Sequence, residues 1–194
     1  MQGATALGDT IVFLTTKGRL IAFPADSDRG TSALGTAPAN VRDLESFGTN
    51  LYVLTADAPH LLKLPVRDGV LQAAKPWLAT TDPISATHFA IDGSIWAAES
   101  AHELMRLYQG KLANRFTLAG ISTSAVQDLE TDEDHDLVAI ATVNPSRIII
   151  AGKDGTVTKQ VASPAFTNVR GLTFFDEDLL VVTPRKTYRV KLAP

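Results

Sequence analysis

Three side chains that can carry acid–base or metal chemistry recur along the chain at intervals of 40–45 residues: Asp43, His88 and Asp128. Each stands third in a short segment whose first and fourth residues are apolar and whose middle two are polar. Two carboxylates and an imidazole that converge on one point could ligate a divalent metal or act as an acid and a base. This pattern raises the hypothesis of a metal-dependent hydrolase or lactonase.

The residues just before these positions favour a simpler interpretation. They include Arg42, Gln127 and Arg170. An adjacent cation weakens a metal site, whereas it neutralises a carboxylate in a polar, water-filled channel. We therefore predict no metal, no cofactor and no catalytic residue, and interpret the positions as the polar lining of a central channel. The candidate binding residues are Arg42, Asp43, His88, Gln127, Asp128 and Arg170.

The elements that must position these residues follow from a repeat. Five short apolar runs begin at residues 11, 51, 95, 137 and 179, so their spacing is 40–44 residues. Each run is too short for a typical helix and is rich in β-branched and aromatic residues, which favours strands. Because the apolar positions are consecutive, we expect cover on both faces of these strands, as stacked sheets provide.

Each run is flanked by further predicted strands. A shorter apolar segment precedes it, and two more segments follow, joined by turns such as Asp68-Gly69 and Gln109-Gly110. Four antiparallel strands every 40–45 residues are typical of a β-propeller. A β-sandwich or barrel would not repeat this order five times, and the coils of a β-solenoid are shorter. The sequence thus predicts an all-β propeller of five blades, within approximate bounds of 1–37, 38–82, 83–122, 123–165 and 166–194.

The third repeat, residues 86–108, resembles an NHL-type repeat, with its Asp92-Gly93 turn, its polar loop and Arg106 before two apolar residues. The fourth repeat agrees in part, through Asn144, Arg147 and 153–155. Extended to Gly120, the third repeat also is similar to C-terminal propellers of bacterial envelope proteins that carry a phosphatase-like domain and a membrane helix upstream. That resemblance implies the extracytoplasmic, interaction-mediating part of a longer, membrane-anchored protein.

Composition narrows the functional classes. The net charge is −3, so no basic field attracts nucleic acid. No apolar stretch reaches the roughly 18 residues of a membrane span, and no signal peptide is evident, so we expect no membrane insertion by this segment. The chain contains no cysteine, which excludes disulfides and thiolate chemistry but does not decide the compartment.

The ends of the chain bear on how the propeller closes. Few residues precede the first predicted strand or follow the last, which leaves no fourth strand for the fifth repeat. Either the fifth blade has three strands or the native chain continues. We expect a single domain over residues 1–194, a closed five-bladed ring with one thin blade, and a monomer.

Recognition in propellers takes place on loops held by a rigid scaffold. We predict a non-catalytic scaffold that binds a protein or peptide through the channel-entry loops, and not nucleic acid. These comprise the loops between second and third strands (15–18, 55–60, 99–102, 142–146 and 183–187) and the connections between blades (35–40, 80–85, 120–125 and 163–168). Trp77 and Trp96 are expected to pack between blades, and His60, His102 and His135 to be solvated loop residues.

Overall fold

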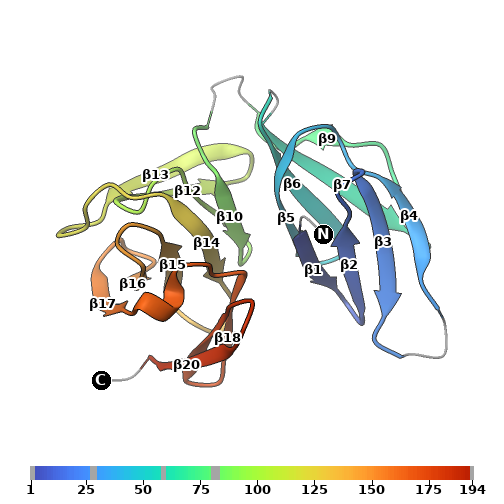
Figure 1. Cartoon of the computed structure of the whole chain (residues 1–194). Coiled ribbons are helices and arrows are strands. Elements are labelled where there is room, and N and C mark those ends of the chain that lie inside the picture. Colours follow the sequence, from blue (N-terminus) through green and yellow to red (C-terminus); the bar gives the residue numbers. More distant parts are fainter. Residues whose placement is uncertain (1–2, 27–29, 58–59, 80–83, 193–194) are drawn as a thin grey trace. The chain divides into compact units, whose positions relative to one another are not determined.

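The computed structural model describes residues 3–26, 30–57, 60–79 and 84–192. It shows an all-β propeller fold built from five antiparallel sheets, in agreement with the predicted fold class (Figure 1). By its internal contacts the chain divides into two compact units, Met1–Ile84 and Ser85–Pro194. The first unit holds two blades and the second holds three. Parts of the predicted loops 55–60 and 80–85 lie outside the described residues.

In the first unit, each blade is a meander. The first blade comprises β1 (Gly3–Leu7), β2 (Thr10–Leu14), β3 (Arg19–Pro24) and β4 (Ser32–Thr36). The second comprises β5 (Val41–Phe47), β6 (Asn50–Thr55), β7 (Leu61–Arg67), β8 (Val70–Leu71) and β9 (Lys75–Pro76). The short strands β8 and β9 both pair with β7, so the predicted single fourth strand of this blade is split in two.

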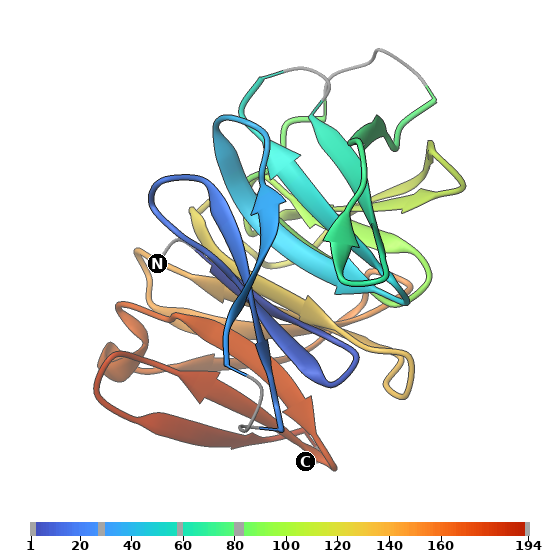
Figure 2. The same ribbon diagram turned by 90° about the vertical axis from the view of Figure 1, so that its right-hand side faces the viewer.

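The second unit contains two four-stranded blades and one three-stranded blade. The third blade comprises β10 (His88–Ile91), β11 (Ile95–Ala98), β12 (Glu103–Tyr108) and β13 (Lys111–Thr117). The fourth comprises β14 (Val126–Thr131), β15 (Leu137–Thr142), β16 (Arg147–Gly152) and β17 (Val157–Ala162), followed by the 3-10 helix η2 (Pro164–Phe166). The fifth comprises β18 (Gly171–Phe175), β19 (Asp178–Val182) and β20 (Thr187–Lys191), drawn in red in Figures 1 and 2, and confirms the predicted thin blade.

Two of the predicted hairpin turns show why glycine is required. Arg67 pairs with Val70 across Asp68-Gly69, and Tyr108 pairs with Lys111 across Gln109-Gly110. Both residues of each turn have positive φ, at 51° and 72° in the first turn and 48° and 76° in the second. A two-residue turn of this kind matches the right-handed twist of the strands, and glycine adopts its second position without steric cost.

Apolar faces of successive blades form the cores. In the first unit, Val12 and Leu14 of β2 pack with Leu51 and Val53 of β6. In the second unit the fourth blade is covered on both faces: Val138 and Ile140 face the third blade, while Ala139 and Ala141 face the fifth. The prediction of cover on both faces is confirmed for β15, which is buried from its second residue to its last.

Within their own units, β2 and β19 are each covered on one face. Ile11 of β2 and Val182 of β19 are exposed. In each strand one face carries the interblade contacts, made by Val12 and Leu14 in β2 and by Leu179 and Val181 in β19.

The first strands of neighbouring blades lie side by side within each unit: β1 beside β5, and β14 beside both β10 and β18. The register of β5 shifts between Val41 and Asp43, and that of β14 shifts between Val126 and Asp128. Each shift is a β-bulge, which turns the side chain of the extra residue away from the regular alternation. Arg42 and Gln127 are those extra residues.

Within the described part of the chain, no helix has the length and hydropathy needed to span a membrane.

Candidate functional site

The two predicted channel residues of the first unit, Arg42 and Asp43, lie at the bulge of β5. Arg42 is exposed and Asp43 is partly buried. The Asp43 carboxylate accepts a hydrogen bond from the backbone N–H of Leu44 at 3.0 Å. Both residues make further interactions.

Gln127, at the corresponding bulge of β14, ties the fourth blade to the segment that leads into the fifth. Its Nε2 donates to the backbone carbonyls of Thr142 at 2.8 Å and Phe166 at 3.0 Å. Its Oε1 accepts from the backbone N–H of Val169 at 3.0 Å. Three backbone groups are thereby satisfied by one side chain, a role that explains a polar residue at this position without any ligand.

Asp128 makes the next link between these blades. Its carboxylate accepts a hydrogen bond from the backbone N–H of Leu172 at 2.6 Å. Burial raises the pKa of the Asp128 carboxyl to about 7, against the opposing effect of the amides of Leu172 and Leu129. Backbone amides therefore donate hydrogen bonds to this buried carboxyl.

His88 and Arg170 complete the predicted set. The Nδ1 atom of His88 lies 3.1 Å from the hydroxyl of Thr87, and burial lowers the His88 pKa to about 4, so the ring is neutral at physiological pH. Arg170 is exposed, and its backbone N–H donates to Val182. Within the described residues, no three His, Asp or Glu side chains are grouped so that they could hold a metal ion. A binding role for the six residues stays a prediction.

The channel-entry loops of the first unit enclose a pocket of about 300 Å³. The loop after β2 contributes Thr16, Lys17 and Gly18, and the connection after β4 contributes 38–41. The N–H of Ala37 donates to the carbonyl of Gly18 at 2.8 Å, which joins the two segments. The Asn40 side chain donates to the Asp57 carboxylate at 2.5 Å and so fixes one wall.

The channel-entry loops of the second unit hold a cluster of hydroxyls around two basic side chains. The Nδ1 atom of His102 lies 2.8 Å from the hydroxyl of Ser100 and 3.4 Å from that of Thr123. Arg147 donates to Ser122 at 3.3 Å and to Gln160 at 2.9 Å. His102 is thus a partly buried residue whose ring lies within hydrogen-bonding distance of two hydroxyls.

A larger pocket, of about 540 Å³, lies at the turns of the third and fourth blades, at the opposite ends of the strands from the channel-entry loops. We call it the turn pocket. The third blade contributes Asp92 and Gly93 from the β10–β11 turn, with Ser94, Trp96, Arg106 and Tyr108. The fourth blade contributes Glu133 and Asp136 from the β14–β15 turn, with Lys153. All of these residues belong to the second unit.

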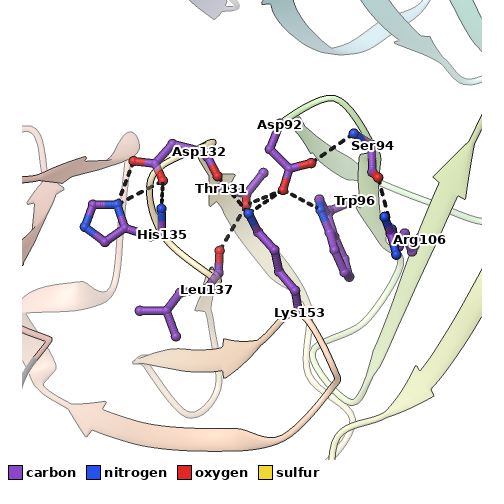
Figure 3. A network of polar contacts seen from close by, with 9 residues as sticks. All are labelled: Asp92, Ser94, Trp96, Arg106, Thr131, Asp132, His135, Leu137 and Lys153. Carbon is purple, nitrogen blue, oxygen red and sulfur yellow. Dashed lines mark hydrogen bonds and ion pairs between the residues drawn. The ribbon is translucent and has the colours of Figure 1, made fainter.

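Asp92 organises the pocket wall (Figure 3). Its Oδ1 accepts from the backbone N–H of Ser94 at 3.0 Å. Its Oδ2 accepts from the indole N–H of Trp96 at 2.9 Å and the hydroxyl of Thr131 at 3.2 Å, and pairs with Lys153 at 2.7 Å. The Asp92 side chain is only 6% exposed, so it is a buried carboxylate whose charge and hydrogen-bonding capacity are satisfied across two blades.

Arg106 lines the turn pocket and is held there by a hydrogen bond and two aromatic rings. Its Nε donates to the hydroxyl of Ser94 at 3.0 Å. Its guanidinium carbon lies 5.7 Å from the ring centroid of Trp96 and 5.9 Å from that of Tyr108, within the range of cation–π attraction. Trp96 itself is 1% exposed and shares a core cluster with Val138 and Ile140 of the fourth blade, so the prediction that it packs between blades is confirmed.

The acidic turn beside the pocket contains His135, and the prediction of a solvated side chain is wrong for this residue. Its ring stacks on Phe174 with centroids 4.8 Å apart, and its two nitrogens contact the Asp132 carboxylate at 2.9 Å and the Asp176 carbonyl at 2.7 Å. Burial acts to lower the His135 pKa, but these two hydrogen bonds and the charges of Asp132 and Asp134 outweigh it and raise the pKa. His135 therefore joins the turns of the fourth and fifth blades.

The turn pocket was not among the sites suggested by the sequence. Of its lining residues, the sequence pattern singled out only the Asp92-Gly93 turn and Arg106. Both were interpreted as structural parts of the third repeat. Comparison with known proteins adds no assignment: no protein-family model matches the chain, and no curated protein matches it.

Proposed function

We propose that the chain is a non-catalytic binding module that takes a protein or peptide partner on its channel-entry loops. The observation that carries the proposal is the pocket of about 300 Å³ formed in the first unit by 16–18 and 38–41. Loops on a rigid sheet scaffold are the usual place for recognition, and a β-propeller fold is consistent with such a scaffold. We also propose that the repeats are of the NHL type, which the third repeat resembles.

The pocket suits part of an extended chain rather than a buried small molecule. Ala39 and Asn40 are exposed, and the backbone polar groups of the two loops lie close to the surface. A peptide is matched by such a wall, because it offers amide groups and small side chains along its length. The hydroxyl cluster around His102 and Arg147 gives the second unit further polar groups on its own channel-entry loops.

A selection experiment tests this function. Peptides are selected from a random library on the purified chain, and the affinity of a synthetic winner is measured by fluorescence anisotropy. Ala39→Arg places a long side chain over the pocket, so we expect binding to weaken about tenfold or more. Asp9→Arg adds the same side chain at the exposed turn after β1 and serves as the matched control.

Loss of affinity in Ala39→Arg alone supports the proposal. Equal affinities in both variants, or failure to select any peptide, contradict it.

A parallel assay with lactone and ester substrates and added divalent cations addresses the second functional class, a metal-dependent hydrolase. Turnover that needs the metal would replace the binding module by a hydrolase.

A further inference from the structure

The turn pocket separates opposite charges on its two walls. Asp92 and Lys153 form an ion pair within the wall and neutralise each other at 2.7 Å. The remaining charged lining residues are Arg106 on the third blade and Glu133 and Asp136 on the fourth. A ligand of one sign would be attracted by one wall and repelled by the other, so the pocket suits a ligand that carries both signs.

The position of Arg106 is fixed before any ligand arrives. The hydrogen bond from Nε to Ser94 restrains one edge of the guanidinium. The contacts with the rings of Trp96 and Tyr108 restrain its planar face. Within the described residues, its two terminal nitrogens make no hydrogen bond or ion pair. A planar guanidinium offers two parallel donors to a carboxylate, and restraint of the side chain lowers the entropic cost of binding.

The opposite wall is exposed and acidic. Glu133 and Asp136 are both exposed residues of the β14–β15 turn. His135 and Lys153 anchor that turn: His135 bonds to Asp132 and Asp176, and the Lys153 ammonium donates to the Asp132 carbonyl at 2.8 Å. The two carboxylates thus stand on a braced turn, where they can accept hydrogen bonds from an ammonium or guanidinium group of a ligand.

We infer that the turn pocket is a second binding site, for a peptide segment in which an acidic and a basic side chain lie close together. Arg106 receives the carboxylate, Glu133 and Asp136 receive the cation, and the half-exposed ring of Tyr108 contacts the stem between them. The pocket, at about 540 Å³, has room for two such side chains. This site is independent of the channel-entry loops, so it stands even if the function proposed for those loops fails.

The probe for this site is the blocked dipeptide N-acetyl-Glu-Lys-amide, titrated into the full-length, isotope-labelled chain. The readout is the NMR signal of the Trp96 indole N–H, which points to Asp92 in the pocket wall and is distinguished from that of Trp77 by the variant Trp77→Phe. We expect a saturable shift of this signal and of the amides of 133–136. The Glu-Gln and Gln-Lys dipeptides, which each lack one charge, should bind about tenfold more weakly.

Variants of both walls complete the test. Arg106→Gln should weaken the Glu-Lys dipeptide about tenfold, whereas Arg115→Gln on β13, outside the pocket, should not. Because Arg106 also packs on Trp96, the double variant Glu133→Gln/Asp136→Asn tests the other wall through exposed residues alone, with Asp134→Asn as its control.

Three results would overturn the inference. The first is that the dipeptide causes no shift of the Trp96 signal. The second is that the pocket variants and the control variants weaken dipeptide binding equally. The third is that inorganic phosphate binds as tightly as the dipeptide, which would indicate an anion site at Arg106 only. A peptide selected for the channel-entry loops that loses affinity in Ala39→Arg but not in Arg106→Gln would show that the two sites are separate.

Discussion

At the scale of single residues, Asp92 carries more of the structure than its place in a hairpin turn suggests. It accepts hydrogen bonds from Ser94, Trp96 and Thr131 and pairs with Lys153. Asp92→Asn removes the charge but leaves the Lys153 ammonium, 18% exposed, without its carboxylate. Removing one partner of such a pair costs about 3 kcal/mol, so we expect the free energy of unfolding to fall by about that amount in urea titrations.

The control for this substitution is Asp134→Asn, which makes the same change on an exposed residue of the neighbouring acidic turn. It should alter stability by less than about 0.5 kcal/mol. Equal effects of the two variants would mean that the Asp92 pair contributes nothing beyond an exposed charge.

Gly155 shows a second requirement at this scale. Its φ is +86°, and a Cβ atom there would lie 2.7 Å from a ring carbon of Phe116, which stacks on Trp96. Gly155→Ala should therefore lose about 2–3 kcal/mol, as the sum of backbone strain and overpacking. Gly69→Ala is the matched control, because Gly69 has φ of +72° with no atom within 4 Å and should lose only about 1 kcal/mol. Thermal unfolding of both variants measures the difference, and equal losses would exclude a steric role for Phe116.

At the scale of elements, the first strand of the fourth blade couples stability to pH through Asp128. Its pKa is about 7 in the folded chain, well above the ordinary value of 3.8. A carboxyl whose folded pKa is raised favours folding when protonated, so its contribution is full below about pH 4 and is lost as the pH rises to about 7. Stability measured by urea titration should fall over that window.

Asp128→Asn isolates this dependence. The amide oxygen of asparagine can still accept from the Leu172 N–H, and the side chain does not titrate. The variant should therefore lose the decline in stability between about pH 4 and 7 and be more stable than the parent chain at neutral pH. An unchanged profile would assign the decline to other groups.

The elements themselves were largely predictable, because strands and turns depend on short stretches of sequence. The five apolar runs and the glycine turns marked the hairpins that form the five sheets. The roles of Gln127 and Asp128 were not predictable. Their partners are the backbone carbonyl of Phe166 and the backbone N–H of Leu172, and since almost every residue carries such groups, the sequence does not single these two out. The turn pocket was missed for a related reason: Asp92 and Lys153 meet only once two blades stack.

At the scale of the whole molecule, the described structure predicts an uneven distribution of local stability. The fourth blade is packed on both faces within its own unit, through Val138 and Ile140 on one side and Ala139 and Ala141 on the other. By contrast, β13 is almost entirely exposed, and β8 and β9 have two residues each. Amides in densely packed strands exchange only through large unfolding events, whereas those of exposed strands exchange through local opening.

Hydrogen exchange followed by mass spectrometry tests this distribution. Peptides covering β15 and β16 should exchange slowest of the described residues, and those covering β8, β9 and β13 should exchange fastest. Ile149→Ala, which removes a fully buried side chain facing the third blade, should cost about 3 kcal/mol and speed exchange in β15 and β16 by the corresponding factor of more than a hundred. In β13 its effect should be small, because local opening there does not require the fourth blade to unfold. Equal acceleration in all these strands would instead mean that the described residues open as one cooperative body.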